Sequence, residues 1–411
     1  MRSHTSIAAT ALMLLGVRAA VSTESDEAAL TDPTAQCTAY SYAPVAAALA
    51  QFPPIWTPVS AMVSTSDPGY VKFLSINASI PNIAPKGVLG VPDEKITDGY
   101  NPADPDCWWT VTQCVTPKVS GVKGDIAAAP EPRTLGYGFD DGPNCSHNAF
   151  YDYLVEKNQK ATMFYIGSNV LDWPLQAQRA VADGHEICVH SWSHRSMTAF
   201  TNEQAFGELW YTMQAIKLVT GVTPTCWRPP LGDVDDRIRY IAQQMGLENV
   251  LWKYNSNDWE VGSNNVTTTT VQGNYDALIA AVGAGTFDTT GAIMLTHELN
   301  NYTMQTAVDN YPKLAAAFDH IVPVGVSLNK TQPYVETNYT QPSFAAYNAA
   351  RVSGASPSGS SSGSAAAASG SGSKSTSGST AGSNQGTSAG VALRVSSLTL
   401  GLVVLGAALA L

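Results

Sequence analysis

Short apolar runs alternate with amphipathic helical segments from about residue 134 onward. The apolar runs occupy residues 134–139, 161–166, 186–189, 250–253, 292–295 and 321–324. Helical periodicity lies between them, over residues 147–158, 175–183, 202–220, 235–245 and 275–283. Thr201, followed three residues later by Gln204, has the spacing of a capping box. The alternation predicts parallel strands linked by helices.

This pattern predicts an α/β fold, a distorted barrel of seven or eight parallel strands. An open, doubly wound sheet would give the same pattern. Residues 21–129 are rich in Pro, Ser and aromatic residues and show helical periodicity only near 46–51. We therefore expect an irregular N-terminal extension that packs on the barrel, a catalytic domain over 130–330 and a C-terminal segment over 331–351.

Both ends of the chain have the pattern of processing signals. Residues 1–20 combine a basic start with an apolar run shorter than the roughly 20 residues of a membrane span, which predicts a cleaved signal peptide. Residues 352–390 form a Ser/Gly/Ala-rich stretch, predicted to be a disordered linker, before an apolar tail over 391–411. We expect glycosylphosphatidylinositol (GPI) attachment at Ser383 or Asn384 with removal of the tail, and the alternative is a tail-anchored helix.

Cysteines and glycosylation sequons agree with a secreted protein. The six cysteines predict disulfides without fixing their pairing, and they form no CxxC pair that would favour a thiolate zinc site: Cys37, Cys107, Cys114, Cys145, Cys188 and Cys226. Six sequons predict N-glycosylation at Asn77, Asn265, Asn301, Asn329, Asn338 and Asn144. Asn144 is the doubtful one, because a glycan beside the site described next would obstruct a polymer.

The net charge of −11 excludes nucleic acid as an expected partner, since a phosphate backbone requires a basic surface. A neutral glycan is compatible with this charge. The candidate chemistry lies where the apolar runs end: Asp140 and Asp141 follow the first, His190 and His194 the third, and His297 the fifth. In a parallel α/β fold the carboxyl ends of the strands build the active site.

Two of these histidines have the spacing of metal ligands. His190 and His194 are four residues apart and could point the same way on one helical turn, and Asp141 offers an oxygen from another strand end. Such a pair alone is more often a pair of surface or core histidines. With the aspartates it predicts a zinc-type site with an open position for water. Because consecutive extended side chains diverge, Asp141 can bind metal while Asp140 faces the water.

Five motifs in residues 133–324 resemble those of the carbohydrate esterase family 4 polysaccharide deacetylases, and most of all those of GPI-anchored fungal chitin deacetylases. They read, in family order, GFDDGP, HSWSH, WRPPLGD, NSNDW and IMLTHE. The resemblance implies Asp140 as the general base. It further implies one divalent ion, zinc or cobalt, held by Asp141, His190 and His194.

The resemblance also assigns the remaining roles. Arg228 would orient Asp140 through two directed hydrogen bonds, and His297 would be the general acid, its pKa raised by Asp258. The backbone N–H of Leu231 would bind the oxyanion. Substrate contacts are implied for Trp259, Leu295, Leu231 and Trp192.

Several positions depart from the family pattern. Gly138 and Ser191 replace threonines, the second keeping the hydroxyl, and Arg195 stands where proline is common. Leu231 replaces a tyrosine, which leaves its backbone donor available. Asn255 replaces an aspartate and puts any charge-dependent role of that position in doubt.

The implied function is metal-dependent hydrolysis of the N-acetyl groups of chitin, giving chitosan and acetate, by an amide hydrolase at the outer plasma membrane and cell wall. The implied partners are chitin or its oligomers, cell-wall glycans and, through the anchor, the membrane. Acetylated xylan or peptidoglycan could be the substrate instead, and an inactive glycan-binding wall protein is a different class. A glycosidase fits poorly, because adjacent aspartates beside metal-spaced histidines do not match its two separated carboxylates.

Overall fold

The computed structural model describes residues 21–89, 97 and 99–354. The predicted signal peptide, the apolar tail, the attachment residues Ser383 and Asn384, and all but the first residues of the predicted linker lie outside the described residues. None of the helices within the described ranges has the length and apolarity needed to cross a membrane.

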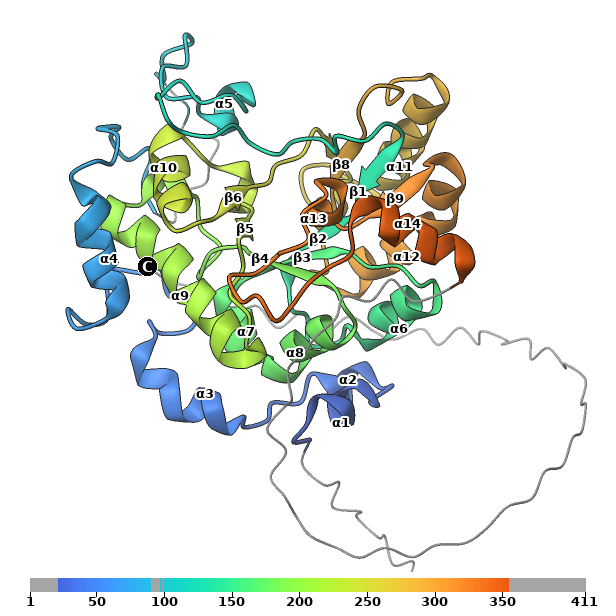
Figure 1. The fold of residues 1–411 in the computed structure, drawn as a ribbon, viewed down its shortest axis with the longest axis horizontal. Helices are drawn as coiled ribbons and strands as arrows, with labels where there is room; N and C mark the ends of the chain where they lie inside the picture. The colour runs from blue at the N-terminus through green and yellow to red at the C-terminus, as the bar shows by residue number, and fades with distance from the viewer. Residues whose placement is uncertain (1–20, 90–96, 98, 355–411) are drawn as a thin grey trace, which may run out of the picture. The chain divides into compact units, whose positions relative to one another are not determined.

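Parallel strands form the centre of the molecule (Figure 1). One sheet has the order β2-β3-β4-β5-β6 and the other β7-β8-β1-β9, and every pairing within them is parallel. The strands are β1 (Thr134–Gly136), β2 (Gly138–Gly142), β3 (Thr162–Tyr165), β4 (Glu186–Val189), β5 (Cys226–Trp227), β6 (Glu248–Asn249), β7 (Tyr254–Asn255), β8 (Ala292–Leu295) and β9 (His320–Val322).

The two sheets join between β2 and the end of β8. Asp140 and His297 form a parallel bridge there, with the Asp140 N–H donating to the Thr296 carbonyl over 2.9 Å. Only Tyr137 separates β1 from β2, so these two form one interrupted strand. Counted in this way, the described residues contain eight strands. The predicted distorted barrel is thereby confirmed, and the open doubly wound sheet is not what forms.

The predicted strand at 250–253 is wrong in position. Those residues lie between β6 and β7, and only Val250 makes a bridge, to Ile126 of the extension. The run is apolar because Val250 and Leu251 are buried in the core. A segment can be buried without pairing as a strand, so the apolar pattern alone did not distinguish the two cases. The two-residue strand β5 was too short for any periodicity to reveal it.

Helices surround the strands, with α9 and α10 on one side and α11 and α12 on the other (Figure 1). Thr201 and Gln204 form the predicted capping box of α9. Helix α11 begins earlier than predicted, because Thr267 and Thr270 form a second capping box. The helices are α6 (Asn148–Glu156), α7 (Gly167–Asp172), α8 (Pro174–Ala182), α9 (Asn202–Thr220), α10 (Asp236–Gln244), α11 (Thr268–Gly283), α12 (Asn301–Ala317), α13 (Val324–Ser327) and α14 (Phe344–Ser353), with 3-10 turns η3 (Met197–Ala199), η4 (Pro230–Gly232) and η5 (Asp258–Glu260).

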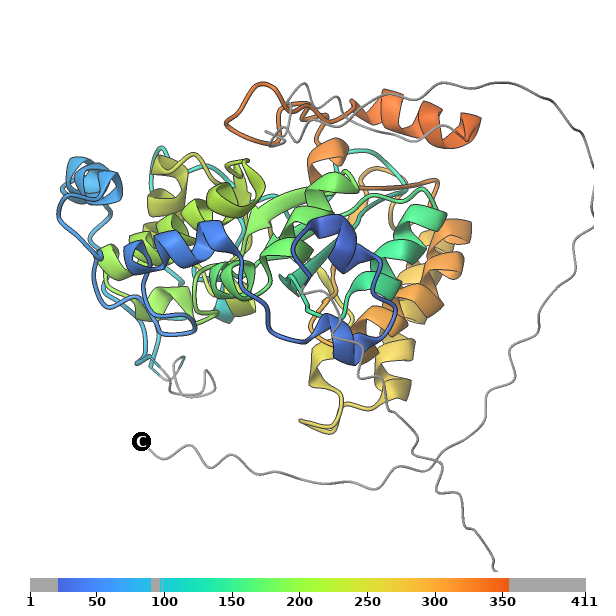
Figure 2. The ribbon, with the colours of Figure 1, turned by 90° about the horizontal axis from the view of Figure 1, so that it is seen from below.

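The N-terminal extension is more helical than predicted. It contains α1 (Glu24–Ala28), α2 (Pro33–Gln36), α3 (Ala43–Ala48), η1 (Leu49–Gln51), α4 (Pro68–Asn77) and α5 (Trp109–Thr112). Asp32 and Asp67 each cap a helix whose first residue is proline, a start signal that does not depend on periodicity. Helix α1 packs on α8 and α3 on α9, along the outside of the barrel (Figure 2).

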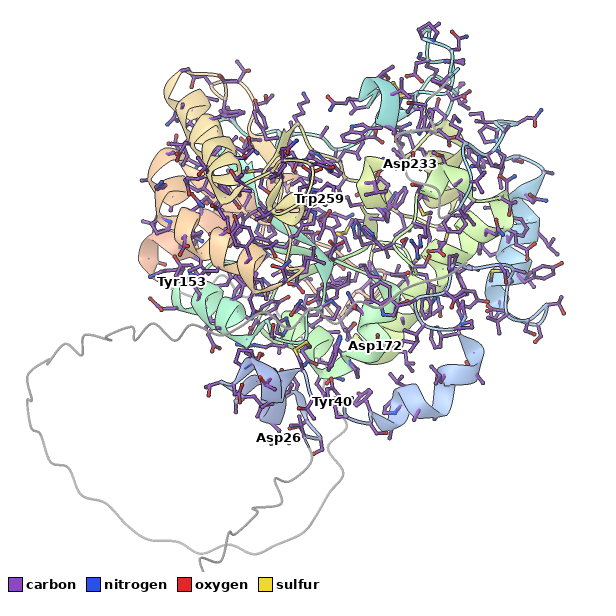
Figure 3. All side chains as sticks on the ribbon, turned by 180° about the vertical axis from the view of Figure 1, so that it is seen from behind. Asp26, Tyr40, Tyr153, Asp172, Asp233 and Trp259 are labelled. Carbon is purple, nitrogen blue, oxygen red and sulfur yellow. A yellow bond between two sulfur atoms is a disulfide. The ribbon has the colours of Figure 1, made fainter. Side chains whose placement is uncertain are left out.

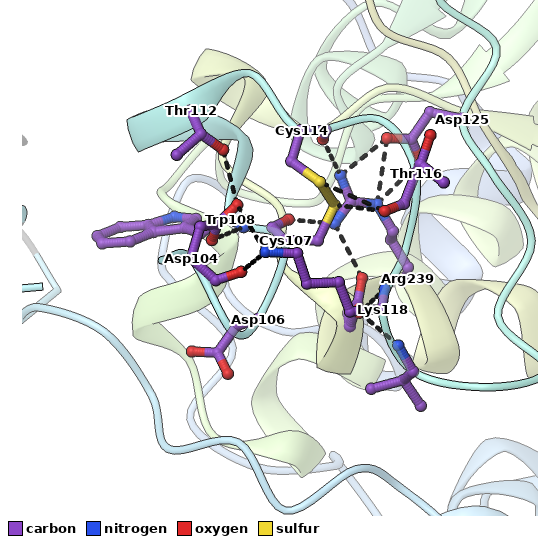
Figure 4. Close-up of a disulfide and its surroundings, with 12 residues drawn as sticks. Asp104, Asp106, Cys107, Trp108, Thr112, Cys114, Thr116, Lys118, Asp125 and Arg239 are labelled. Atoms are coloured by element: carbon purple, nitrogen blue, oxygen red, sulfur yellow. Dashed lines mark hydrogen bonds and ion pairs between the residues drawn. A yellow bond between two sulfur atoms is a disulfide. The ribbon is translucent and has the colours of Figure 1, made fainter. Parts of the chain in front are cut away.

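Covalent and ionic contacts fix the extension to the barrel. Cys37 pairs with Cys145, just after β2, while Cys188–Cys226 links β4 to β5, so the prediction of disulfides is confirmed. Beside the third disulfide, Cys107–Cys114, the buried guanidinium of Arg239 donates to Asp125, over 2.8 Å from Nη2, and to the carbonyls of both cysteines (Figure 4). The extension and the barrel therefore share one set of buried polar contacts.

Candidate active site

Asp141, His190 and His194 form a group that could hold a metal ion. Their ligand atoms all lie within 4.8 Å of one another, and Asp141 Oδ1 is 3.1 Å from His194 Nε2 and 3.4 Å from His190 Nε2. His190 Nδ1 lies 2.8 Å from the Arg228 carbonyl, which leaves Nε2 to face the carboxylate. The buried Asp141 Oδ1 has no hydrogen-bond partner. A divalent cation fits this donor set of one carboxylate and two imidazoles.

Backbone conformation brings these ligands together in a way the sequence pattern did not indicate. Residues 190–194 form a loop after β4, with Ser191 and His194 at positive φ, so the prediction of a helical turn is wrong. Asp140 and Asp141 do not diverge as consecutive extended residues would. Asp141 has φ 72° and the register of β2 shifts between Asp140 and Gly142, which turns both carboxylates toward His190.

Asp140 is buried beside Arg228. Arg228 Nη1 donates to Asp140 Oδ1 over 2.6 Å, and Asp140 Oδ2 lies 3.7 Å from His190 Nε2. The predicted bidentate pair is wrong, because the buried Nη2 of Arg228 has no hydrogen-bond partner. The guanidinium lies 3.9 Å from the centre of the Phe164 ring, which fixes it from one side. Asp140 thus keeps one oxygen directed toward the histidines.

His297 is held by Asp258. Its Nδ1 lies 2.6 Å from Asp258 Oδ1, and its backbone N–H donates to Asp258 Oδ2 over 3.0 Å. Burial alone would lower the pKa of His297, but the carboxylate outweighs burial and raises the pKa to about 9. The imidazole can therefore carry a proton at neutral pH, as an acid must.

Asp140, Asp141, His190, His194 and His297 all line one cavity of about 610 Å³. Leu231, Trp259 and Leu295 line it as the resemblance implied, and Figure 3 labels Trp259 on η5. The prediction that Trp192 contacts the substrate is wrong. Its side chain is fully buried, stacks on Phe52 with ring centres 5.8 Å apart, and does not line the cavity. An aromatic residue between two metal ligands looks like a substrate contact in sequence, but here it packs inward against the N-terminal extension.

Sequence reasoning missed a buried carboxyl group directly after His297. Glu298 accepts from Tyr151 Oη over 2.8 Å and from the Asn144 N–H over 3.1 Å, and burial raises its pKa to about 8. A Cβ on Gly142 would lie 1.9 Å from Glu298 Oε1, which explains why glycine follows the two aspartates. An acidic residue next to a motif histidine was the available signal.

The sequons differ in their surroundings. Asn77, Asn265, Asn301, Asn329 and Asn338 are exposed. Asn144 is partly buried, and its Nδ2 donates to the Leu299 carbonyl over 2.7 Å at the edge of the cavity. Glycosylation at all six stays a prediction, with Asn144 still the weakest.

Known proteins match the chain over most of its length. The sequence profile of the family described as polysaccharide deacetylase matches residues 127–250. Chitin deacetylase 2 of Cryptococcus neoformans is 51% identical over 337 residues, covering 80% of this chain and 73% of that protein. Chitin deacetylase of Amylomyces rouxii is 48% identical, covering 74% and 73%.

Among solved structures, the chitin deacetylase from the fungal pathogen Colletotrichum lindemuthianum is 20% identical and matches with a TM-score of 0.47, covering 51% of this chain and 94% of that one. The sequence relatives are similar over 337 and 317 residues, well beyond the profile match. With this identity and this coverage, the chain belongs to the polysaccharide deacetylase family.

Proposed function

We propose that the protein is a chitin deacetylase that hydrolyses the N-acetyl groups of N-acetylglucosamine residues, releasing acetate and leaving chitosan. The observation that carries the proposal is the meeting of Asp140, His297 and the Asp141–His190–His194 group in one cavity. The names of the two fungal relatives favour chitin as the polymer.

Asp141, His190 and His194 would hold one divalent cation, zinc or cobalt. When bound, the ion supplies Lewis-acid polarisation of the acetyl carbonyl and lowers the pKa of water in the site. Asp141 Oδ1 supports this assignment, because it is buried and faces both imidazoles without forming a hydrogen bond to either. Burial alone would raise the pKa of Asp141, but the neighbouring His194 and His190 hold it well below its usual range, so the ligand is a carboxylate.

Different groups of the protein then carry out the separate steps of amide hydrolysis. Asp140, oriented by Arg228, takes a proton from the attacking water. The backbone N–H of Leu231 is the proposed donor to the oxyanion, while Trp259 and Leu295 enclose the acetyl group. Departure of the amine needs a proton at nitrogen, and His297 supplies it from the protonated state that Asp258 favours.

Asp258→Asn is expected to move the alkaline limb of the pH–rate profile to lower pH, by about one unit or more. The reason is that His297 must be protonated to act as an acid, and the variant removes the charge that holds the proton. The measurement is kcat/KM for acetate release against pH. Glu260→Gln neutralises a nearby carboxylate that bonds Asn257 instead, and should leave the limb in place. An unshifted limb in Asp258→Asn would refute this role.

Acetate release from defined chitin oligomers tests the function itself. Product masses should fall by one acetyl group at a time without loss of sugar units, which separates a deacetylase from a glycosidase. A chelator should abolish the reaction and added zinc or cobalt restore it. Acetylated xylan and peptidoglycan, run in parallel, test the other substrates. Binding to the oligomers without any acetate release would instead identify an inactive glycan-binding protein.

We further propose that the protein is secreted and held at the outer plasma membrane and cell wall by a GPI anchor. Three disulfides support an oxidising compartment. The sequence pattern around Ser383 and Asn384 supports the anchor. Release from intact cells by a phosphatidylinositol-specific phospholipase is the expected result, and retention after that treatment would favour the tail-anchored helix.

A further inference from the structure

Part of the wall of the catalytic cavity comes from outside the barrel. Trp56, Trp109 and Gln113 of the N-terminal extension line it together with the groups assigned to catalysis. Trp109 is nearly buried and packs against the loop that carries Leu231, since a Cβ on Gly232 would lie 2.2 Å from its ring. Trp56 differs from Trp109 because 43% of its surface is exposed.

Trp56 is held firmly although its ring is exposed. Its backbone N–H donates to Ser168 Oγ over 2.8 Å, and its indole Nε1 donates to Asp172 Oδ2, at the end of α7, over 3.0 Å. Its backbone has φ 62°, a conformation that bulky residues rarely adopt. Such outliers persist only where the surroundings enforce them. The ring is thus fixed in place rather than free to sweep through solvent.

The segment that carries Trp56 is tied to the loop of the two histidines. Buried Glu208, on α9, accepts the Val59 N–H over 2.9 Å through one oxygen. Its other oxygen accepts the backbone N–H groups of Trp192 and Ser193, over 2.9 and 2.8 Å. Because Trp192 and Ser193 lie between His190 and His194, one carboxyl group links the segment just after Trp56 to the loop of two proposed metal ligands.

A fixed, exposed indole in a cavity suits a sugar ring. Pyranoses with equatorial substituents present flat C–H faces that pack on aromatic rings, while their hydroxyls remain free for polar groups. Such groups are at hand, because Gln113, Lys253 and Asn255 also line the cavity. Trp259, 40% exposed, supplies a second indole from η5, an element separate from α7, whose Asp172 holds Trp56 (Figure 3).

We propose that Trp56 is a stacking platform for a sugar unit of the N-acetylglucosamine chain other than the unit that is deacetylated. The inference rests on the proposed chitin deacetylase function and adds a specificity residue from the extension. The cavity volume, about 610 Å³, is in the range of ~300–1,000 Å³ that holds ligands much larger than an acetamide group. Binding energy from such a remote unit would favour longer oligomers over short ones.

The test is kcat/KM for acetate release on chitin oligomers from the disaccharide to the hexasaccharide. Trp56→Ala should lose activity increasingly with oligomer length, reaching a loss of about tenfold on the longest, the usual scale for a buried aromatic contact. Trp56→Phe keeps an aromatic face without the bond to Asp172 and should lose less at every length. It also remains informative if the alanine variant folds poorly, which circular dichroism and thermal melting would reveal.

Trp210→Ala is the matched control. Trp210 lines a separate cavity between α9 and residues 48–68 of the extension, and its Nε1 donates to Asp67 over 3.1 Å, much as Trp56 donates to Asp172. This control should show no dependence of its loss on length. A loss of equal size at all lengths in both Trp56 variants, or no loss in either, would overturn the inference. Absence of acetate release by the unmodified protein would instead refute the proposed function, so the two failures are distinguishable.

Discussion

Asp140→Asn is expected to lower acetate release by about 10²–10⁴-fold while the protein keeps its metal. The amide cannot take a proton from water, but it has nearly the same shape and can still accept from Arg228 Nη1, which lies 2.6 Å away in the unmodified protein. The variant leaves the proposed metal ligands Asp141, His190 and His194 unchanged. Turnover by the purified variant and its metal content by mass spectrometry are measured on the same sample.

Asp276→Asn is the matched control for that variant. Asp276 is exposed on α11, where it bonds Gln272 and Lys313, so the same change in charge should leave both turnover and metal content as they were. Retained turnover in Asp140→Asn would overturn the base assignment. Loss of metal from it would show that Asp140 is itself a ligand.

His190→Ala is expected to lose metal and activity together. The variant removes one of three ligands, and since even outer partners of metal ligands change affinity by about 10–100-fold, loss of a ligand should weaken binding by at least that factor. Metal titration of the chelator-treated protein measures the affinity, and acetate release gives the activity. Buried Asp141 would then face His194 alone, so a lower melting temperature is also expected.

His320→Ala provides the comparison. His320 begins β9 and packs on Phe344, away from the cavity, so its loss should change neither metal affinity nor turnover. If His190→Ala binds metal as tightly as the unmodified protein, the ligand set proposed here is wrong. Comparison with Asp140→Asn is equally informative, because only one of the two variants should release its ion.

The sequence predicted the barrel and the identity of the converging residues, because both depend on short-range patterns. Apolar runs of strand length mark the buried strands β3, β4 and β8, and polar residues directly after them must meet at one edge of a parallel sheet. The capping box at Thr201 is similarly local. The resemblance to known deacetylases then gave the roles of these residues.

What the sequence could not predict depends on backbone turns and on contacts between distant segments. Asp141 and His194 reach the site through left-handed conformations that no periodicity encodes. Trp192 was predicted to contact substrate, and its burial could not be foreseen because it depends on Phe52, far away in the chain. Trp56 was missed for the same reason, since nothing near it in sequence indicates Ser168 or Asp172 as partners.

The Cys37–Cys145 bond has a consequence for how this enzyme can be produced. A fragment cut at the start of the family profile, residue 127, would leave Cys145 as a lone thiol a few residues from Asp141 and would expose the faces of α8 and α9 that α1 and α3 cover. Synthesis in a reducing cytoplasm would leave the same thiol unpaired. Recombinant work should therefore keep the extension from before Cys37 onward and use an oxidising host.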